Sequence, residues 1–100
     1  MPQFFLRQAA EQDLEEIWLY SFKRWGKQQA DDYISALLNR LQWLAEHPNA
    51  GKLRPDVEPG YCYFPEGRHL IFYQLQAEDI EIIGIVHQSM DYLDHFENEP

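Results

Sequence analysis

The chain has 100 residues and carries 17 acidic against 8 basic side chains, a formal net charge of −9 at pH 7. So acidic a surface repels phosphate, which disfavours direct binding to nucleic acid. The 45% hydrophobic and 15% aromatic fractions exclude a disordered chain, and the length fits one domain over residues 1–100. A lone cysteine, Cys62, excludes an intrachain disulfide. Because no signal-peptide pattern or transmembrane run is found, we expect a cytoplasmic protein with no membrane partner.

The first third of the chain predicts a strand and a helix. Residues 3–7 form a short apolar run that is typical of a strand. From Ala10 onward apolar residues recur at helical spacing, and Trp18 and Trp25 fall on the stripe that we expect to be buried. Gly26 is well placed to end this helix.

A second helix is predicted directly after Gly26. Its apolar stripe runs from Ala30 to Ala45 and ends before Pro48, and so short a turn predicts an antiparallel helical hairpin. Trp43 falls about 200° from the centre of this stripe, on the face away from the sheet. It therefore either packs under the irregular loop expected at residues 49–60 or contacts a partner. The acidic residues expected in the first turns of the two helices are Glu11, Asp13, Asp31 and Asp32.

The last third of the chain predicts the centre of a sheet. Residues 61–64 form one strand, and residues 67–76 and 80–87 form a hairpin around a short acidic break. Both hairpin strands are apolar on both faces, which indicates cover on each side. A three-residue loop would set Gln76 opposite Ile80. It would also set Phe72 opposite Gly84 and His69 opposite His87.

This register also predicts which side chains share a face. The residues expected on the histidines' face are Ile71, Tyr73, Ile83 and Ile85, and those on the other face are Leu70, Phe72, Ile82 and Val86. Residues 90–96 are expected to form a short helix or a docked tail. The fold class is therefore α+β, in the order β-α-α-β-β-β, with the helical hairpin packed on a mainly antiparallel sheet.

The residues alone show no catalytic set. His69 and His87 have no third ligand at a recognisable spacing, so we predict neither a metal nor a cofactor and expect partly buried imidazoles bonded to backbone or tyrosine. Arg68 begins the central strand, where it either meets a partner or a phosphate or pairs with Glu66 or Asp91. These features indicate a compact binding domain.

Several stretches resemble a known family when they are taken together and in order. They are Ala9-Ala10, Asp13-Leu14 and Ile17; residues 24–30; residues 44–48 with Gly51; Pro59-Gly60-Tyr61; residues 64–73; and residues 85–91. The set is similar to the ParE toxins of bacterial type II toxin–antitoxin modules, in the RelE/ParE superfamily, from about Phe5 to Asp91.

The resemblance implies a RelE-like fold, a ParD-type antitoxin that forms a hetero-oligomer with the toxin, and DNA gyrase as the target. ParE toxins act on gyrase by protein contact, so no catalytic residue is expected. The matched motifs place the gyrase contact on Arg68, His69, His87, Met90 and Asp91. The large aromatic residues expected to meet the antitoxin are Trp43, Trp25 and Phe22.

Two alternatives stay open at this point. The RelE branch cleaves mRNA in the ribosome with a basic and aromatic cluster, but this chain has Leu70 and Ile71 where an arginine would be needed. Arg68, His69 and His87 are the residues that would have to replace that cluster. The second alternative is an inactive member that only binds an antitoxin as a plasmid or chromosome stabilisation protein. The acidic balance also predicts an antitoxin segment with compensating Lys or Arg.

Overall fold

The computed structural model describes residues 2–89, so Met90, Asp91 and the tail expected at residues 90–96 lie outside the described residues. The described elements confirm the predicted order. They are β1 (Phe4–Leu6), α1 (Gln8–Trp25), α2 (Lys27–Glu46), the 3-10 helix η1 (Pro48–Ala50), β2 (Lys52–Leu53), β3 (Cys62–Glu66), β4 (His69–Gln76) and β5 (Asp79–His87). The region predicted as an irregular loop thus contains one turn of 3-10 helix and a two-residue strand paired with β3.

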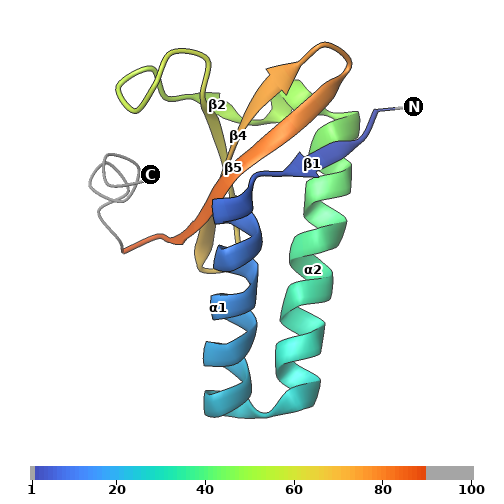
Figure 1. The fold of residues 1–100 in the computed structure, drawn as a ribbon, viewed down its shortest axis with the longest axis vertical. Helices are drawn as coiled ribbons and strands as arrows, with labels where there is room; N and C mark the ends of the chain where they lie inside the picture. Colours follow the sequence, from blue (N-terminus) through green and yellow to red (C-terminus); the bar gives the residue numbers. More distant parts are fainter. Residues whose placement is uncertain (1, 90–100) are drawn as a thin grey trace.

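The two helices form an antiparallel hairpin whose far end extends beyond the sheet (Figure 1). Gly26 joins them with a φ of 95°, a left-handed conformation that glycine adopts without strain. Because one residue makes the whole connection, α2 already begins at Lys27. The prediction that Asp31 lies in the first turn is therefore wrong. Asp31 instead pairs with Lys27 Nζ at 2.6 Å and accepts a hydrogen bond from Trp18 Nε1 at 2.8 Å.

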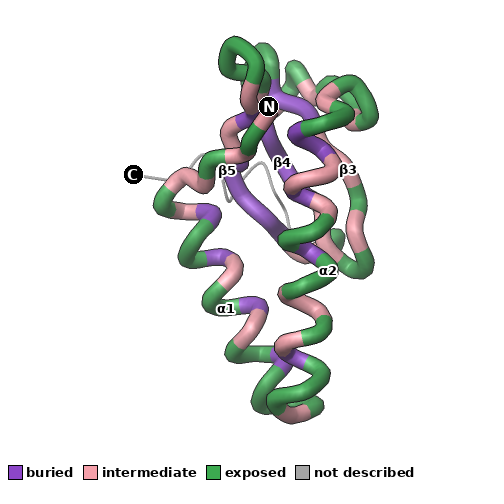
Figure 2. The backbone as a smooth tube through the Cα atoms, turned by 90° about the vertical axis from the view of Figure 1, so that its right-hand side faces the viewer, coloured by how far each residue is buried: buried purple, intermediate pink, exposed green. Residues whose placement is uncertain are grey.

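The sheet has the strand order β1-β5-β4-β3-β2, with β1 parallel to β5 and every other pair antiparallel. The predicted hairpin, β4 and β5, is central and contains the longest buried runs (Figure 2). Apolar clusters lie on both of its faces. No helix among the described residues is long and apolar enough to cross a membrane.

The predicted register is confirmed at one end of the hairpin and wrong at the other. His69 pairs with His87 and Phe72 with Gly84, but Gln76 pairs with Asp79. The loop has two residues, and Ala77 at its start takes a φ of 56°. A bulge after Phe72 absorbs the difference of one residue.

The bulge exchanges two side chains between the faces of the sheet. Ile82 packs against the helices and Ile83 packs on the opposite face with Phe72, the reverse of the prediction. Trp25, predicted to be buried, is 50% exposed because it lies at the end of α1 that extends past the sheet. Cys62 is a buried residue of β3, and burial raises the pKa of its thiol.

Candidate functional site: a cleft between the helical hairpin and the sheet

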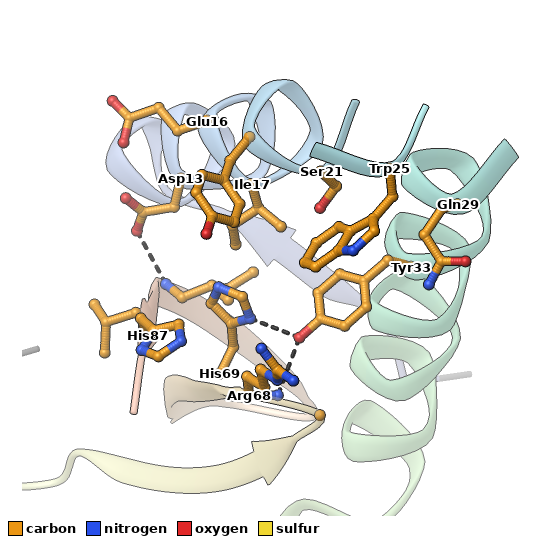
Figure 3. Close-up of a pocket in the computed structure, with 14 residues that line it drawn as sticks. Asp13, Glu16, Ile17, Ser21, Trp25, Gln29, Tyr33, Arg68, His69 and His87 are labelled. Carbon is orange, nitrogen blue, oxygen red and sulfur yellow. Dashed lines mark hydrogen bonds between the residues drawn. The ribbon is translucent and has the colours of Figure 1, made fainter. Parts of the chain in front are cut away.

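A cleft of about 860 Å³ lies where the helical hairpin extends past the end of the sheet (Figure 3). Its size is within the range of small-ligand sites. The residues of α1 and α2 that line it are Asp13, Glu16, Ile17, Tyr20, Ser21, Trp25, Gln29 and Tyr33. The opposite wall consists of Gly67 and Arg68 in the β3–β4 turn, His69 on β4, and Ile85, Val86 and His87 on β5.

Asp13 fixes the position of α1 over this end of β5. Strand β1 pairs with β5 only as far as Ile82, and no other strand among residues 2–89 pairs with that side of β5 beyond this residue. The buried Asp13 carboxylate accepts the Ile85 amide hydrogen at 2.9 Å. Asp13 thus satisfies a buried backbone donor. The prediction that it lies in the first turn of the helix is wrong, because α1 begins at Gln8 and its first turn contains only Glu11 as an acid.

Tyr33 links α2 to the β3–β4 turn and sets the tautomer of His69. The Tyr33 hydroxyl oxygen accepts the Arg68 amide hydrogen at 3.1 Å and lies 2.6 Å from His69 Nδ1. Because the hydroxyl hydrogen also needs an acceptor, the arrangement that satisfies both groups has the Tyr33 hydroxyl donating to Nδ1. His69 is then neutral with its hydrogen on Nε2. Burial, and then the charge of His87, lower the pKa of His69 to about 4, which keeps the ring neutral.

His87 lies beside His69 with its ring edge-on, 5.4 Å between centroids. Its Nδ1 is 2.7 Å from Ser89 Oγ and accepts the Ser89 amide hydrogen at 3.2 Å. Nδ1 is thus occupied in both rings, which leaves Nε2 of each for a ligand. The bond between His69 and Tyr33 confirms the expectation of an imidazole held by tyrosine. No group of three potential metal ligands occurs among residues 2–89.

Arg68 lines the cleft and is exposed to solvent. The proposed pairing with Glu66 is wrong, because Glu66 binds Arg40 Nε at 2.7 Å across the flank of α2. Within residues 2–89 the Arg68 guanidinium forms no ion pair. Asp91, the other predicted partner, lies outside the described residues.

The aromatic residues predicted to meet an antitoxin lie in different places. Trp25 lines the cleft in edge contact with Tyr20, which is 60% exposed. Phe22 is 43% exposed and stacks on Trp18 outside the cleft.

Trp43 does not lie on a face away from the sheet. Its ring packs on Phe64 of β3 with 5.4 Å between centroids and stacks on His47. The Arg40 guanidinium lies over it at 4.7 Å. The sheet is twisted, so β3 lies beneath this flank of α2. The angle of Trp43 around an ideal helix does not show where a twisted sheet lies.

The sequence analysis did not identify Tyr20, Glu16 and Ser21 as lining residues. Tyr33 fell within the apolar stripe from Ala30 to Ala45 and was expected only to pack in the core. The available signal was the Tyr33 hydroxyl, because a tyrosine on a core stripe needs a hydrogen-bond partner. The sequence does not say which element supplies that partner.

The architecture is that of a small α+β domain in which a helical hairpin packs on a mainly antiparallel sheet. A solved structure described as a chromosomal ParDE TA system from P. aeruginosa superposes with a TM-score of 0.72 and covers 87% of this chain and 95% of that one. The two sequences are 19% identical, so this likeness shows the shared fold.

The sequence comparisons identify the family. The family model described as "ParE toxin of type II toxin-antitoxin system, parDE" matches residues 4–92. Toxin ParE1 of Caulobacter vibrioides is 38% identical over 95 residues, covering 95% of this chain and 98% of the relative. Toxin ParE1 of Mycobacterium tuberculosis is 34% identical over 90 residues, covering 89% and 92%. The chain belongs to the ParE toxin family.

Proposed function

We propose that this toxin inhibits DNA gyrase, and so replication, by protein–protein contact, and that a ParD-type antitoxin neutralises it. The observation that carries the proposal is membership of the ParE family over nearly the whole chain. A contact mechanism agrees with the acidic composition, because a net charge of −9 opposes the approach of a nucleic-acid backbone.

The antitoxin is proposed to contact the helical hairpin. Four large apolar or aromatic side chains are exposed on the second half of α1: Leu19, Tyr20, Phe22 and Trp25. So many on one exposed segment are typical of a protein interface. We propose Trp25 and Phe22 as anchors on two sides of α1, with Trp43 contributing at the edge near β3, where it is only partly buried.

The gyrase contact is proposed to lie on Arg68, His69 and His87, with Met90 and Asp91 following in the chain. The first three line one wall of the cleft, opposite Trp25 on the other wall. An antitoxin segment bound in the cleft would therefore cover the residues proposed for gyrase. This overlap gives a physical account of neutralisation by competition for one surface.

A second candidate, mRNA cleavage, rests on the meeting of Arg68, His69 and His87 in one cleft. Two imidazoles beside a guanidinium are groups that acid–base cleavage of a phosphodiester uses. However, a pKa of about 4 makes His69 a weak base at neutral pH, and the carboxylates of Asp13 and Glu16 lie across the cleft. Inhibition by contact is therefore the better supported function.

The test is a supercoiling assay with purified gyrase and toxin, run beside an mRNA cleavage assay on translating ribosomes. We expect inhibition in the first, intact transcripts in the second, and recovery of supercoiling when the protein encoded beside the toxin gene is added. Cleaved transcripts with unaffected gyrase would replace the proposal with the ribonuclease function. No effect in either assay, with antitoxin binding retained, would indicate an inactive toxin.

A further inference from the structure

We propose that Arg68, His69 and His87 form a subsite that receives one carboxylate side chain of the antitoxin segment bound in the cleft. This inference rests on the proposed function, because it presupposes an antitoxin. It goes further by stating the chemistry that the segment must present and the place where that group binds.

The first argument is the direction of the hydrogen bonds around the two imidazoles. Tyr33 and Ser89 occupy Nδ1 of His69 and His87 respectively, at 2.6 and 2.7 Å. Each ring therefore presents Nε2–H, a donor, and both rings line the cleft (Figure 3). The two ring centroids lie 5.4 Å apart. Two neighbouring donors suit a group that only accepts, and an ionised carboxylate has two accepting oxygens.

The second argument is the charge of Arg68. Carboxylates outnumber cations 17 to 8 in the sequence, and the ion pairs within residues 2–89 involve Arg7, Lys27, Arg40 and Arg54. Arg68 has none of these pairs, although it lines a cleft. A guanidinium binds a carboxylate through two parallel N–H donors, so Arg68 is suited to bind an anion in this cleft.

The third argument selects a polypeptide over a nucleic acid. The facing wall carries apolar and aromatic surface from Ile17, Tyr20 and Trp25, together with the carboxylate of Glu16. A nucleic-acid backbone would bring repeated negative charges against that wall and against a net charge of −9. An amphipathic polypeptide segment can place its apolar side chains against α1 and one carboxylate against Arg68, so it can contact both walls of the cleft.

The experiment uses the full-length toxin and the protein encoded beside its gene as the probe. Dissociation constants are measured for the wild type, Arg68→Glu, Arg68→Lys and His87→Phe. We expect Arg68→Glu to weaken binding at least about 30-fold, because it reverses the charge that meets the carboxylate, and His87→Phe about tenfold, because it removes a hydrogen bond to an ionised group. Arg68→Lys should weaken binding less, because lysine keeps the charge and loses only the two parallel donors. Lys52→Glu, with the same change of charge on exposed β2 outside the cleft, is the control and should bind as the wild type does.

A charge-reversal screen then identifies the carboxylate. Each Asp and Glu of the neighbouring protein is changed in turn to Lys, and we expect one such variant to bind Arg68→Glu more tightly than it binds the wild type. Wild-type affinity of Arg68→Glu, or rescue by no single reversal, would overturn the subsite while leaving the proposed function intact. A neighbour that binds no form of the toxin would instead contradict the proposed neutralisation. Loss of single-stranded RNA binding by Arg68→Glu, with antitoxin affinity unchanged, would assign the subsite to nucleic acid.

Discussion

The hydroxyl of Tyr33 on α2 lies 2.6 Å from Nδ1 of His69 on β4, and both residues line the cleft. The same oxygen accepts the Arg68 amide hydrogen at 3.1 Å. One side chain thus ties the extended helical hairpin to the turn that carries the proposed gyrase and antitoxin contacts. We therefore expect the position of His69 to depend on this hydroxyl.

Removing the hydroxyl tests that dependence. We expect Tyr33→Phe to lower the free energy of unfolding by about 1–3 kcal/mol, because it leaves His69 Nδ1 and the Arg68 amide without their partner. The measurement is urea denaturation followed by fluorescence. Tyr20→Phe is the matched control, because the Tyr20 side chain is 60% exposed, and it should change stability little. Equal stability of the two variants would show that the hydroxyl of Tyr33 does not hold the cleft wall.

The lowered pKa of His69 predicts a dependence of stability on pH. Above the unfolded value near 6.5, both states hold His69 neutral and the group makes no difference. As pH falls below 6.5, His69 of the unfolded chain binds a proton, whereas His69 of the folded chain binds one only near pH 4. The free energy of unfolding therefore decreases between pH 6.5 and 4. Stability should therefore fall more steeply between pH 6.5 and 4 in the wild type than in His69→Gln. An NMR titration that places the His69 pKa near 6.5 would contradict this.

A third prediction concerns the segment that was expected to be an irregular loop. Buried Tyr73 donates its hydroxyl hydrogen to Pro48 O at 2.8 Å and accepts the Gly51 amide hydrogen at 2.9 Å. A Cβ at Gly51 would come within 2.8 Å of the Tyr73 ring carbon Cε1. Gly51→Ala should therefore cost about 1–3 kcal/mol of unfolding free energy, the usual range for overpacking. Thermal or urea unfolding measures it, and Asn49→Ala, at an exposed neighbour, should be close to neutral.

The sequence predicted the elements because their signals are local, but the cleft depends on relations that are not local. Alternation and turn residues were enough to set His69 opposite His87. They did not indicate the bulge that moves Ile82 to the helix side, since a two-residue loop with a bulge and a longer loop without one give the same pairing at that end.

The prediction of which aromatic residues are buried failed for a related reason. Helical periodicity placed Trp25 on a buried stripe, yet the stripe continues past the end of the sheet, and there the side chain is half exposed. The length of a helix relative to its sheet is a tertiary property. The site therefore follows from where the sheet ends, and this explains why the cleft residues of α1 were missed.

The last prediction concerns gyrase. The double variant Arg68→Ala, His87→Ala removes a guanidinium and an imidazole from the same cleft wall, and we expect it to raise the toxin concentration for half-inhibition of supercoiling at least about tenfold. Both side chains lie at least partly in solvent, so the fold should persist, and circular dichroism with urea denaturation checks this. The matched control is Lys23→Ala, Lys52→Ala, which removes two exposed side chains outside the cleft. Inhibition by the double variant equal to that of the wild type would remove this wall from the gyrase contact. A loss shared by the control would indicate that overall charge, and not this wall, determines inhibition.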